Sequence, residues 1–299
     1  MSEFLQQFLN GLALGAIYAL IALGYTMVYG VLRFINFAHS DIFMVGAFAA
    51  YYFAKWFGRV LPPESIVGAT LITLASMATC ALLGVVIEKL AYRPLRDRSK
   101  LNVLITAIGV SLFLEYSGQL VFGADPKTFS LLPSRNVEVG DLVLNSNQLI
   151  VFGMTLVLLL ALRYIVMRTR IGTAMRAVSF NHQAAALMGI NIDSVISFTF
   201  ALGSALAAAG GILYAMNYPA IDPLMGVLPG LKAFVAAVLG GIGNIPGAAL
   251  GGVLLGLVES FVRGSRFSTY ADAIAFAILI LILLFRPAGI MGKRVVEKV

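Results

Sequence analysis

The chain consists of long apolar runs separated by short polar segments, and this pattern predicts its architecture. The longer runs have about 20 residues, enough for an α-helix to cross the ~30 Å hydrocarbon core of a bilayer. A membrane barrel would instead show alternating segments of about ten residues. Because backbone groups in lipid must be hydrogen-bonded within the chain, we expect an all-α, polytopic bundle of membrane-spanning helices.

The apolar runs define the helices expected in a single transmembrane domain over residues 1–299. They cover residues 9–32, 42–57, 66–91, 101–122, 148–166, 194–216, 231–239, 246–262 and 273–285. The run 231–239 is short for a crossing at ~1.5 Å per residue; it either crosses in full, giving about eight spans, or forms a re-entrant pair with 246–262. Each half contains one interrupted segment, at residues 36–41 and 240–246, as in many transporter pathways.

Basic residues at the ends of the runs predict the orientation of the chain. They are Arg33; Lys89, Arg93, Arg96, Arg98 and Lys100; Arg163, Arg168, Arg170 and Arg176; and Arg286, Lys293, Arg294 and Lys298. Short cytoplasmic loops are rich in Lys and Arg, so these segments are expected in the cytoplasm. The opposite loops carry Glu64, Asp125, Glu138, Asp141 and Asp222. The N-terminus is therefore expected outside the membrane and the C-terminus inside.

Composition excludes several other classes of protein. Only 12% of the residues are charged and 60% are hydrophobic, whereas a soluble domain has about 25% charged residues. The net charge of +7 comes from residues at the ends of the runs, so it indicates topology and not nucleic-acid binding. The only Gly-Lys pair, Gly292-Lys293, has Pro287 where a phosphate-binding loop needs its first glycine. The only histidines, His39 and His182, have no neighbouring thiolates. We expect neither an enzyme nor a metal site.

A polar interruption at residues 167–193 separates two apolar runs, and residues 169–193 form the expected cytoplasmic loop. Asn181 can cap a short helix over residues 181–188, and Gly189 can end it in the left-handed conformation. Two helical turns are only marginally stable alone in water, so this helix needs a partner. It is either a surface helix lying on the membrane domain or a docking helix for a motor subunit.

Polar residues inside the apolar part are candidates for a translocation pathway or gate. They are Asn36, His39, Asp41, Glu115 and Asn244. A charge at the bilayer centre costs roughly 2.5–3.5 kcal/mol, so Asp41 needs a partner, water or a position near the interface. The alternative for residues 36–41 is a structural role at the cytoplasmic face, with Ser40 or Asp41 capping the next helix. Glu115 and Glu259 are single carboxylates within spans, for which the alternative is a partner elsewhere in the bundle.

Glycines recur every four residues near the end of the chain. They are Gly243, Gly247 and Gly251, together with Gly252 and Gly256. This spacing places glycines in a stripe on one helix face and lets another backbone approach closely. The partner helix lies either in this chain or in a second subunit. Asn244-Ile245-Pro246 is expected to break the helix just before the stripe.

Four longer segments together resemble a known family. They are residues 20–40, which include ALGYTMVYGVLRFINFAHS, residues 88–96 (EKLAYRPLR), residues 176–191 (RAVSFNHQAAALMGIN) and residues 230–243 (GLKAFVAAVLGGIG). With the ending PAGIMG at residues 287–292, nearly the whole chain is similar to the permease family of branched-chain amino acid ABC importers. The similarity is greatest to the H-type subunit of these importers.

The resemblance implies a set of partners in a bacterial inner membrane. These are a second permease subunit of the M type, two cytoplasmic ATP-binding subunits, and a periplasmic binding protein that delivers leucine, isoleucine or valine. The chain itself would need no cofactor, because the partner subunits bind ATP and Mg. Alternatives are a urea or short-amide permease of the same family and a secondary transporter driven by protons through Glu115 and Asp41.

The resemblance also implies which residues of the loop contact the ATPase. They are Arg176, Asn181, Ala184, Ala185, Leu187, Gly189, Ile190 and Asn191. The family often has acidic residues ahead of the alanines, where this chain has Ser179-Phe180-Asn181. The resemblance therefore implies no particular ion pair with the ATPase at that position, whereas the Ala-Ala and Gly-Ile-Asn part of the motif is intact.

Overall fold

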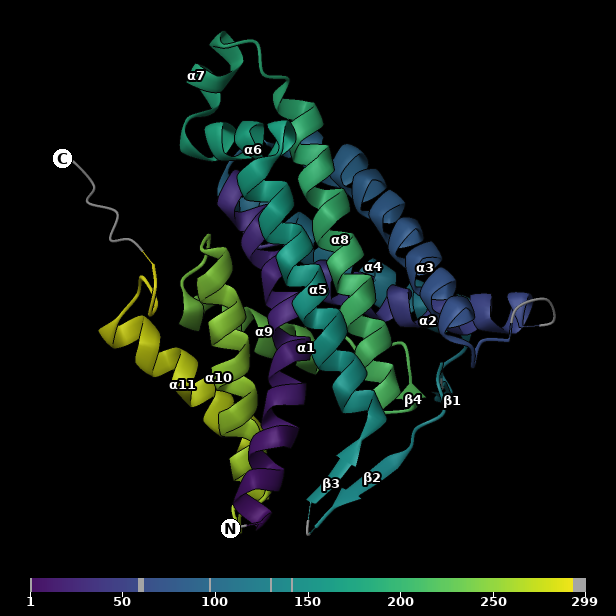
Figure 1. Cartoon of the computed structure of the whole chain (residues 1–299). Helices are drawn as coiled ribbons and strands as arrows, with labels where there is room; N and C mark the ends of the chain where they lie inside the picture. Colours follow the sequence, from purple (N-terminus) through teal and green to yellow (C-terminus); the bar gives the residue numbers. More distant parts are fainter. Residues whose placement is uncertain (1, 59–61, 97, 130, 141, 293–299) are drawn as a thin grey trace.

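The computed structural model describes residues 2–58, 62–96, 98–129, 131–140 and 142–292, and it shows an almost entirely helical chain (Figure 1). The helices are α1 (Ser2–Leu32), α2 (His39–Phe57), α3 (Ile66–Ile87), α4 (Lys100–Phe122), α5 (Ser146–Arg168), α6 (Arg170–Phe180), α7 (His182–Leu187), α8 (Ile192–Asn217), α9 (Val227–Gly240), α10 (Ile245–Arg263) and α11 (Ala271–Phe285). A π-helical turn (Glu88–Tyr92) and a 3₁₀ turn (Arg93–Leu95) extend α3, and a 3₁₀ turn (Ser268–Tyr270) precedes α11. The all-α expectation is confirmed.

Short strands occur only in the connections between helices, as far as the chain is described, and the β2–β3 hairpin lies at the end of the bundle that carries the N-terminus (Figure 1). Strand β1 (Lys127–Thr128) pairs antiparallel with β4 (Ala220–Ile221). Strands β2 (Asn136–Val139) and β3 (Leu142–Asn145) form an antiparallel hairpin with Val137 opposite Leu144. Helices α6 and α7 lie at the opposite end of the bundle (Figure 1). The expected cytoplasmic Lys293, Arg294 and Lys298 and the expected outer Asp141 lie outside the described residues.

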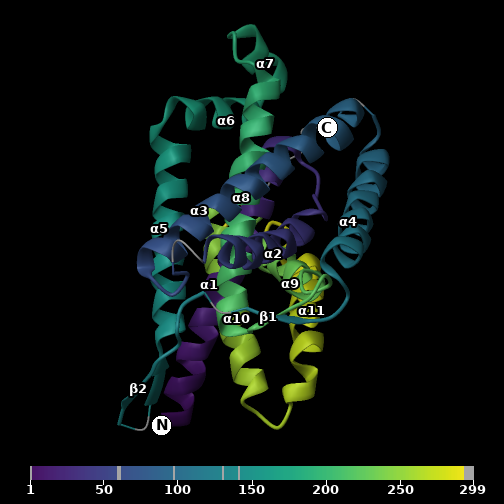
Figure 2. The ribbon, with the colours of Figure 1, turned by 90° about the vertical axis from the view of Figure 1, so that its right-hand side faces the viewer.

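Seven helical segments of the described chain are long and apolar enough to cross a bilayer, close to the eight or so expected. They are Ser2–Leu32, Ile66–Leu95, Lys100–Phe122, Ser146–Arg168, Ile192–Asn217, Ile245–Arg263 and Ser268–Phe285. The 14 residues of α9 span only ~21 Å at 1.5 Å per residue, less than the ~30 Å core. Helix α2 lies across the long axis of its neighbours in both side views (Figures 1 and 2). The chain is thus a multi-pass membrane protein with two interior helices, α2 and α9, that are not typical spans.

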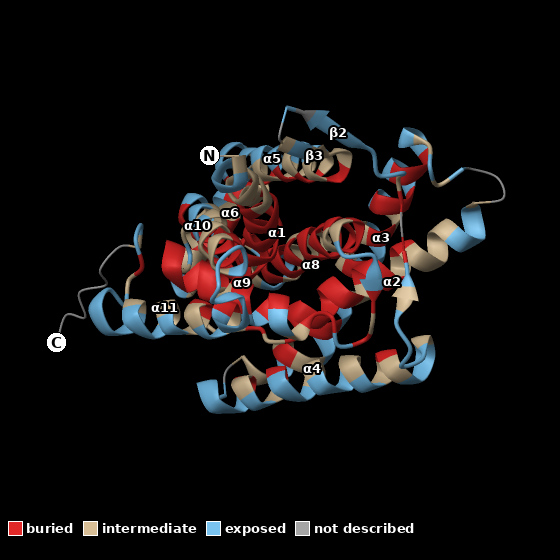
Figure 3. Ribbon diagram, turned by 90° about the horizontal axis from the view of Figure 1, so that it is seen from below, coloured by how far each residue is buried: buried red, intermediate tan, exposed pale blue. Residues whose placement is uncertain are grey.

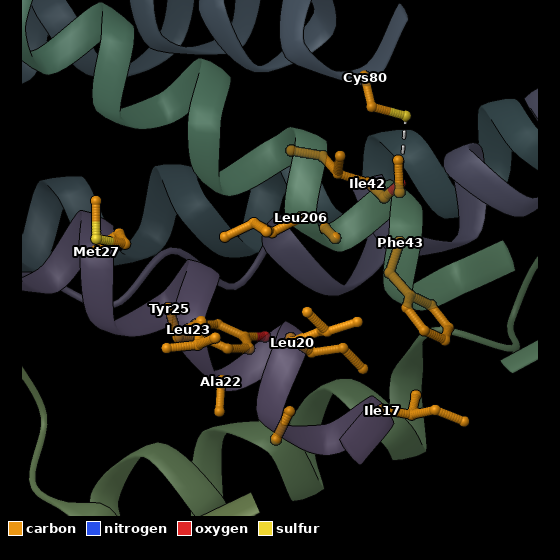
Figure 4. Packing of buried hydrophobic residues seen from close by; sticks show 14 of the residues in the cluster. Ile17, Leu20, Ala22, Leu23, Tyr25, Met27, Ile42, Phe43, Cys80 and Leu206 are labelled. Atoms are coloured by element: carbon orange, nitrogen blue, oxygen red, sulfur yellow. Dashed lines mark hydrogen bonds between the residues drawn. The ribbon is translucent and has the colours of Figure 1, made fainter. Parts of the chain in front are cut away.

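Helix α1 forms the centre of the bundle and packs against α8, α9 and α10. Almost every residue from Gly11 to Val28 is buried. Side chains of α1, such as Ile17 and Leu20, meet Phe43 of α2 and Leu206 of α8 in one apolar core (Figure 4). By contrast, α4 and α11 bury few of their residues (Figure 3). Their exposed apolar side chains suit a surface that faces lipid or another subunit.

The glycines of α10 bring two different helices close to it. A Cβ at Gly252 or Gly256 would overlap backbone atoms of α1, at Ala19 and Gly15 respectively. A Cβ at Gly247 or Gly251 would instead overlap backbone of α9, at Gly240 and Ala236. The partner backbones are therefore in this chain, and they lie on two faces of α10.

Gly243 does not belong to this stripe, which corrects the expected four-residue pattern. It precedes α10, has a φ of 91°, and its nearest contact is the Cα of Gly30. The backbone there makes the turn between α9 and α10, so the left-handed conformation is what requires glycine. Gly243 and Gly247 are four residues apart by coincidence, because Gly243 lies in the turn and Gly247 lies in the helix.

Replacing Gly256 with leucine is expected to destabilise the bundle strongly. The side chain would have to displace the backbone of α1 at Gly15, and overpacking of a dense core typically costs about 1–3 kcal/mol or more. The midpoint of thermal unfolding in detergent should fall by several degrees. Gly153→Leu on α5 is the matched control, because nothing lies within 4 Å of a Cβ at that position. Equal melting temperatures for the two variants would contradict the close packing of α1 on α10.

Candidate functional site

The expected loop 169–193 folds into two short helices whose ends are fixed by capping side chains. Thr169 accepts a hydrogen bond from the Gly172 amide (3.1 Å), and Asn181 accepts one from the Ala184 amide (3.0 Å). Gly189 has a φ of 82°, and the Ile190 amide donates to the Ala185 carbonyl (3.1 Å) to close α7. Asn191 then caps α8 by accepting from the Ser194 amide (3.0 Å). Six of the eight predicted contact residues thus have a local structural role in shaping α7 and its exit.

Helix α7 exposes an apolar surface at the end of the molecule. Phe180, Leu187 and Met188 are each more than four-fifths exposed (87, 88 and 83%). A shallow groove beside them is lined by residues of α6 and α7, including Arg176, Ala177, Phe180, Asn181, Ala184 and Ala185. Large exposed apolar side chains gathered in this way mark a protein interaction surface. We call Phe180, Leu187 and Met188 the α7 surface.

An ion-pair cluster connects the exit of α7 to the end of α3. Asp193 pairs with Arg96 (2.5 Å) and Arg93 (3.6 Å). Fully buried Glu88 pairs with the same two arginines and accepts a hydrogen bond from the Ser197 hydroxyl (2.6 Å). This cluster joins the first turn of α8 to the α3 extension. Ion pairs therefore connect the segment that follows α7 to the bundle.

The second histidine, His182, lies on α7 beside this cluster. Partial burial lowers its pKa, and the guanidinium groups of Arg33 and Arg96 act in the same direction. The imidazole is therefore neutral at pH 7, because its pKa lies below the usual 6.5. Among the described residues, no group of three His, Cys, Asp or Glu side chains is placed to hold a metal ion.

Three of the predicted pathway residues are buried together where α2 begins. Tyr92 donates its hydroxyl hydrogen bond to Asn36 (2.6 Å). The His39 ring lies against Tyr25 with ring centres 4.8 Å apart. Asp41 accepts a hydrogen bond from Ser111 of α4 (2.5 Å). These contacts hold a polar layer between α1, α2 and α4.

Glu115 joins this layer, whereas Asn244 does not. Glu115 lies close enough to Asp41 for an electrostatic interaction between the two carboxyl groups. Asn244 caps α10 by accepting from the Gly247 amide (3.1 Å), and its amide donates to the Met291 carbonyl (2.8 Å). Asn244 therefore secures the turn between α9 and α10 against the segment that follows α11.

The expectation that Ser40 or Asp41 caps α2 is wrong. The capping position is Ala38, which makes no side-chain hydrogen bond to the helix end. Ser40 instead donates to the Phe37 carbonyl (2.9 Å), and Asp41 turns toward α4. The short turns over residues 36–41 satisfy the first amides through backbone bonds, so a side-chain cap is unnecessary.

Sequence reasoning considered a partner for Glu259 elsewhere in the bundle, but it missed the buried charge cluster around Lys232. Its ammonium group lies 2.7 Å from Glu259 and 2.5 Å from Asp272, and its side chain is only 3% exposed. Glu259, with no exposed side-chain surface, also pairs with Arg263 (2.5 Å) and accepts from the Tyr18 hydroxyl (2.9 Å). The cluster therefore joins α1, α9, α10 and α11. The sequence signals for this cluster were the single carboxylate Glu259 and its i, i+4 spacing to Arg263.

The fold and these polar groups define a multi-pass membrane protein of the permease class, with charged groups paired inside the bundle and one exposed apolar helix at its end. The chain belongs to the family described as branched-chain amino acid transport system / permease component, which it matches over residues 7–283.

Relatives similar to the chain over nearly their full length carry matching descriptions. The high-affinity branched-chain amino acid transport system permease protein BraD of Pseudomonas aeruginosa is 42% identical over 306 residues, covering 99% of this chain and 98% of BraD. The permease protein LivH of Escherichia coli K12, described in the same words, is 40% identical over 308 residues, covering 99% and 98%. A probable branched-chain amino acid transport permease of Methanocaldococcus jannaschii is 31% identical, covering 91% and 88%.

Proposed function

We propose that the chain is a transmembrane subunit of an ATP-driven importer of leucine, isoleucine and valine. The observation that carries this proposal is the 40–42% identity, over almost the whole chain, to permeases described as high-affinity branched-chain amino acid transporters. The proposed partners are a second permease subunit, two ATP-binding subunits that supply the ATP and Mg sites, and a periplasmic binding protein. The proposed location is a bacterial inner membrane.

In this proposal the α7 surface receives an ATP-binding subunit. Its exposure and its position at one end of the bundle support the assignment. The residues proposed to couple α7 to this subunit are Arg176, Asn181, Ala184, Ala185, Leu187, Gly189, Ile190 and Asn191. Closure of the ATPase dimer would move α6 and α7 as a unit, and the Glu88–Asp193 cluster would transmit the movement to α3 and α8.

The orientation follows from the same assignment. The end with α6 and α7 faces the cytoplasm, and the end with the N-terminus and the β2–β3 hairpin faces the periplasm, where the binding protein docks. Basic residues at the α7 end, such as Arg33 and Arg96, support this orientation. The polar layer with Asn36, His39, Asp41 and Glu115 lies between α1, α2 and α4, and it is the proposed gate region, where a shift of α2 against α4 would change access.

Reconstitution tests the proposal directly. The complete complex in proteoliposomes should accumulate labelled leucine only when ATP and the binding protein are present, and a protonophore should leave uptake unchanged. Urea at equal concentration should not be accumulated. Uptake that needs no ATPase and collapses with the proton gradient would replace the proposal with a secondary transporter that uses Glu115 and Asp41.

A further inference from the structure

A polar cavity lies inside the bundle at the end that carries the N-terminus, between α1, α5, α8 and α10. Its volume is about 310 Å³, at the lower end of the range of small-molecule sites. Ala13, Leu14 and Ile17 of α1 form an apolar wall, and polar side chains, including Gln148 and Arg263, form the rest. Amide and guanidinium groups do not face lipid without cost, so this cavity is built to hold water or a polar ligand.

One acceptor in this cavity has no partner among the described residues. The Gln148 amide nitrogen donates to Asn10 (2.9 Å), which fixes the orientation of the carboxamide. The Gln148 Oε1 atom is buried and receives no hydrogen bond. A buried acceptor without a donor costs about 1–3 kcal/mol. A ligand that brings an N–H group to this atom would remove that cost.

The same cavity offers a cation that is only partly neutralised. Arg263 pairs with Glu259 (2.5 Å) and its other terminal nitrogen approaches the Tyr218 hydroxyl (3.4 Å). Its side chain remains 43% exposed. A guanidinium group has five N–H donors, so donors are left for a carboxylate. Because Glu259 and Asp272 together balance Arg263 and Lys232, the cavity suits a ligand with no net charge.

We propose that this cavity is a transient site for an apolar α-amino acid on its way through the permease. The ammonium group donates to Gln148 Oε1, the carboxylate accepts from Arg263, and the side chain lies against α1 at Ala13 and Leu14. Zwitterionic ends and an apolar side chain match the three kinds of group that line the cavity. Urea and short amides lack both the carboxylate and the apolar side chain. This inference rests on the proposed function, and it places a substrate site that the pathway residues predicted from the sequence do not include.

Variants of the cavity in the complete reconstituted complex test the proposal. Gln148→Leu removes the acceptor and keeps a side chain of similar volume. We expect the ratio of leucine imported to ATP hydrolysed to fall about tenfold, because a hydrogen bond to a charged group is lost. Stimulation of the ATPase by the loaded binding protein should persist. Gln119→Leu on α4 makes the same chemical change away from the cavity and should leave the ratio unchanged. An unchanged ratio in Gln148→Leu overturns the proposal.

A measurement on the wild-type complex avoids any effect of the variants on folding. Leucine carrying a photoreactive diazirine, delivered by the binding protein to a complex arrested with vanadate, should label residues 13–17 of α1. Labelling confined to other segments, such as the start of α2, overturns the site while leaving the importer function intact. A wild-type complex that imports no apolar amino acid overturns both the site and the proposed function.

Discussion

Leu187→Asp is expected to abolish ATP-driven leucine uptake while the protein remains folded in the membrane. Leu187 is 88% exposed, so its side chain contributes little to the fold. Burying a leucine at an interface contributes about 1.5–3 kcal/mol, and an unpaired carboxylate at the same place adds a desolvation cost. Together these changes should separate the ATP-binding subunits from the α7 surface. Uptake should be measured alongside copurification of the ATPase on a tagged permease.

The control for this experiment is Leu187→Met, which keeps an apolar side chain of similar size. It should retain uptake and copurification. The elution profile and melting temperature of the isolated Leu187→Asp permease should equal those of the wild type. If Leu187→Asp copurifies with the ATPase as fully as wild type and imports leucine, the α7 surface is not where the motor subunit binds.

The spans could be predicted because hydrophobic length is a direct physical requirement of the bilayer. The predicted run 194–216 corresponds to α8 (Ile192–Asn217), and 148–166 corresponds to α5 (Ser146–Arg168). The first helix starts at Ser2, before the predicted residue 9, because the polar residues at its start are also helical. Gln6 and Asn10 are examples of polar residues within this helix. Their side chains bond to each other (3.2 Å), and Gln6 also donates to the Val143 carbonyl (3.1 Å). Hydropathy has no information about such partners.

Local capping was also predictable, since it depends on residues close together in the chain. Asn181 and Gly189 predicted α7 within one residue at each end. The extension of α3 through Tyr92 to Leu95 was not predicted, because the polar segment resembled a loop. Arg93 and Arg96 turn back to the buried Glu88, and that contact makes helical turns favourable there.

The buried charge cluster shows what a single sequence leaves out. Lys232 stands in an apolar run, and its partners Glu259 and Asp272 lie on different helices. Their proximity depends on the packing of α9 against α10 and α11, which no spacing rule gives. The glycines had the same limit: their spacing predicted close packing, but not that Gly251 faces α9 while Gly252 faces α1.

Glu259→Leu is expected to be the most destabilising single change in the bundle. Glu259 is fully buried and contacts Lys232, Arg263 and the Tyr18 hydroxyl. Removing one partner of a buried ion pair typically costs about 3–5 kcal/mol, because the remaining charge is left uncompensated. The variant should accumulate poorly, and the purified protein should unfold at a clearly lower temperature than wild type.

A second substitution separates this charge effect from a simple loss of packing. In Glu259→Leu, the 3%-exposed Lys232 keeps only Asp272, which is half-exposed and itself in contact with solvent. Adding Lys232→Met removes the uncompensated buried cation, while Arg263 and Asp272 can both be solvated. The double variant should therefore be more stable than Glu259→Leu alone, even though it differs more from wild type. If the losses of stability from the two single substitutions simply add in the double variant, the cluster acts through shape and not through paired charge.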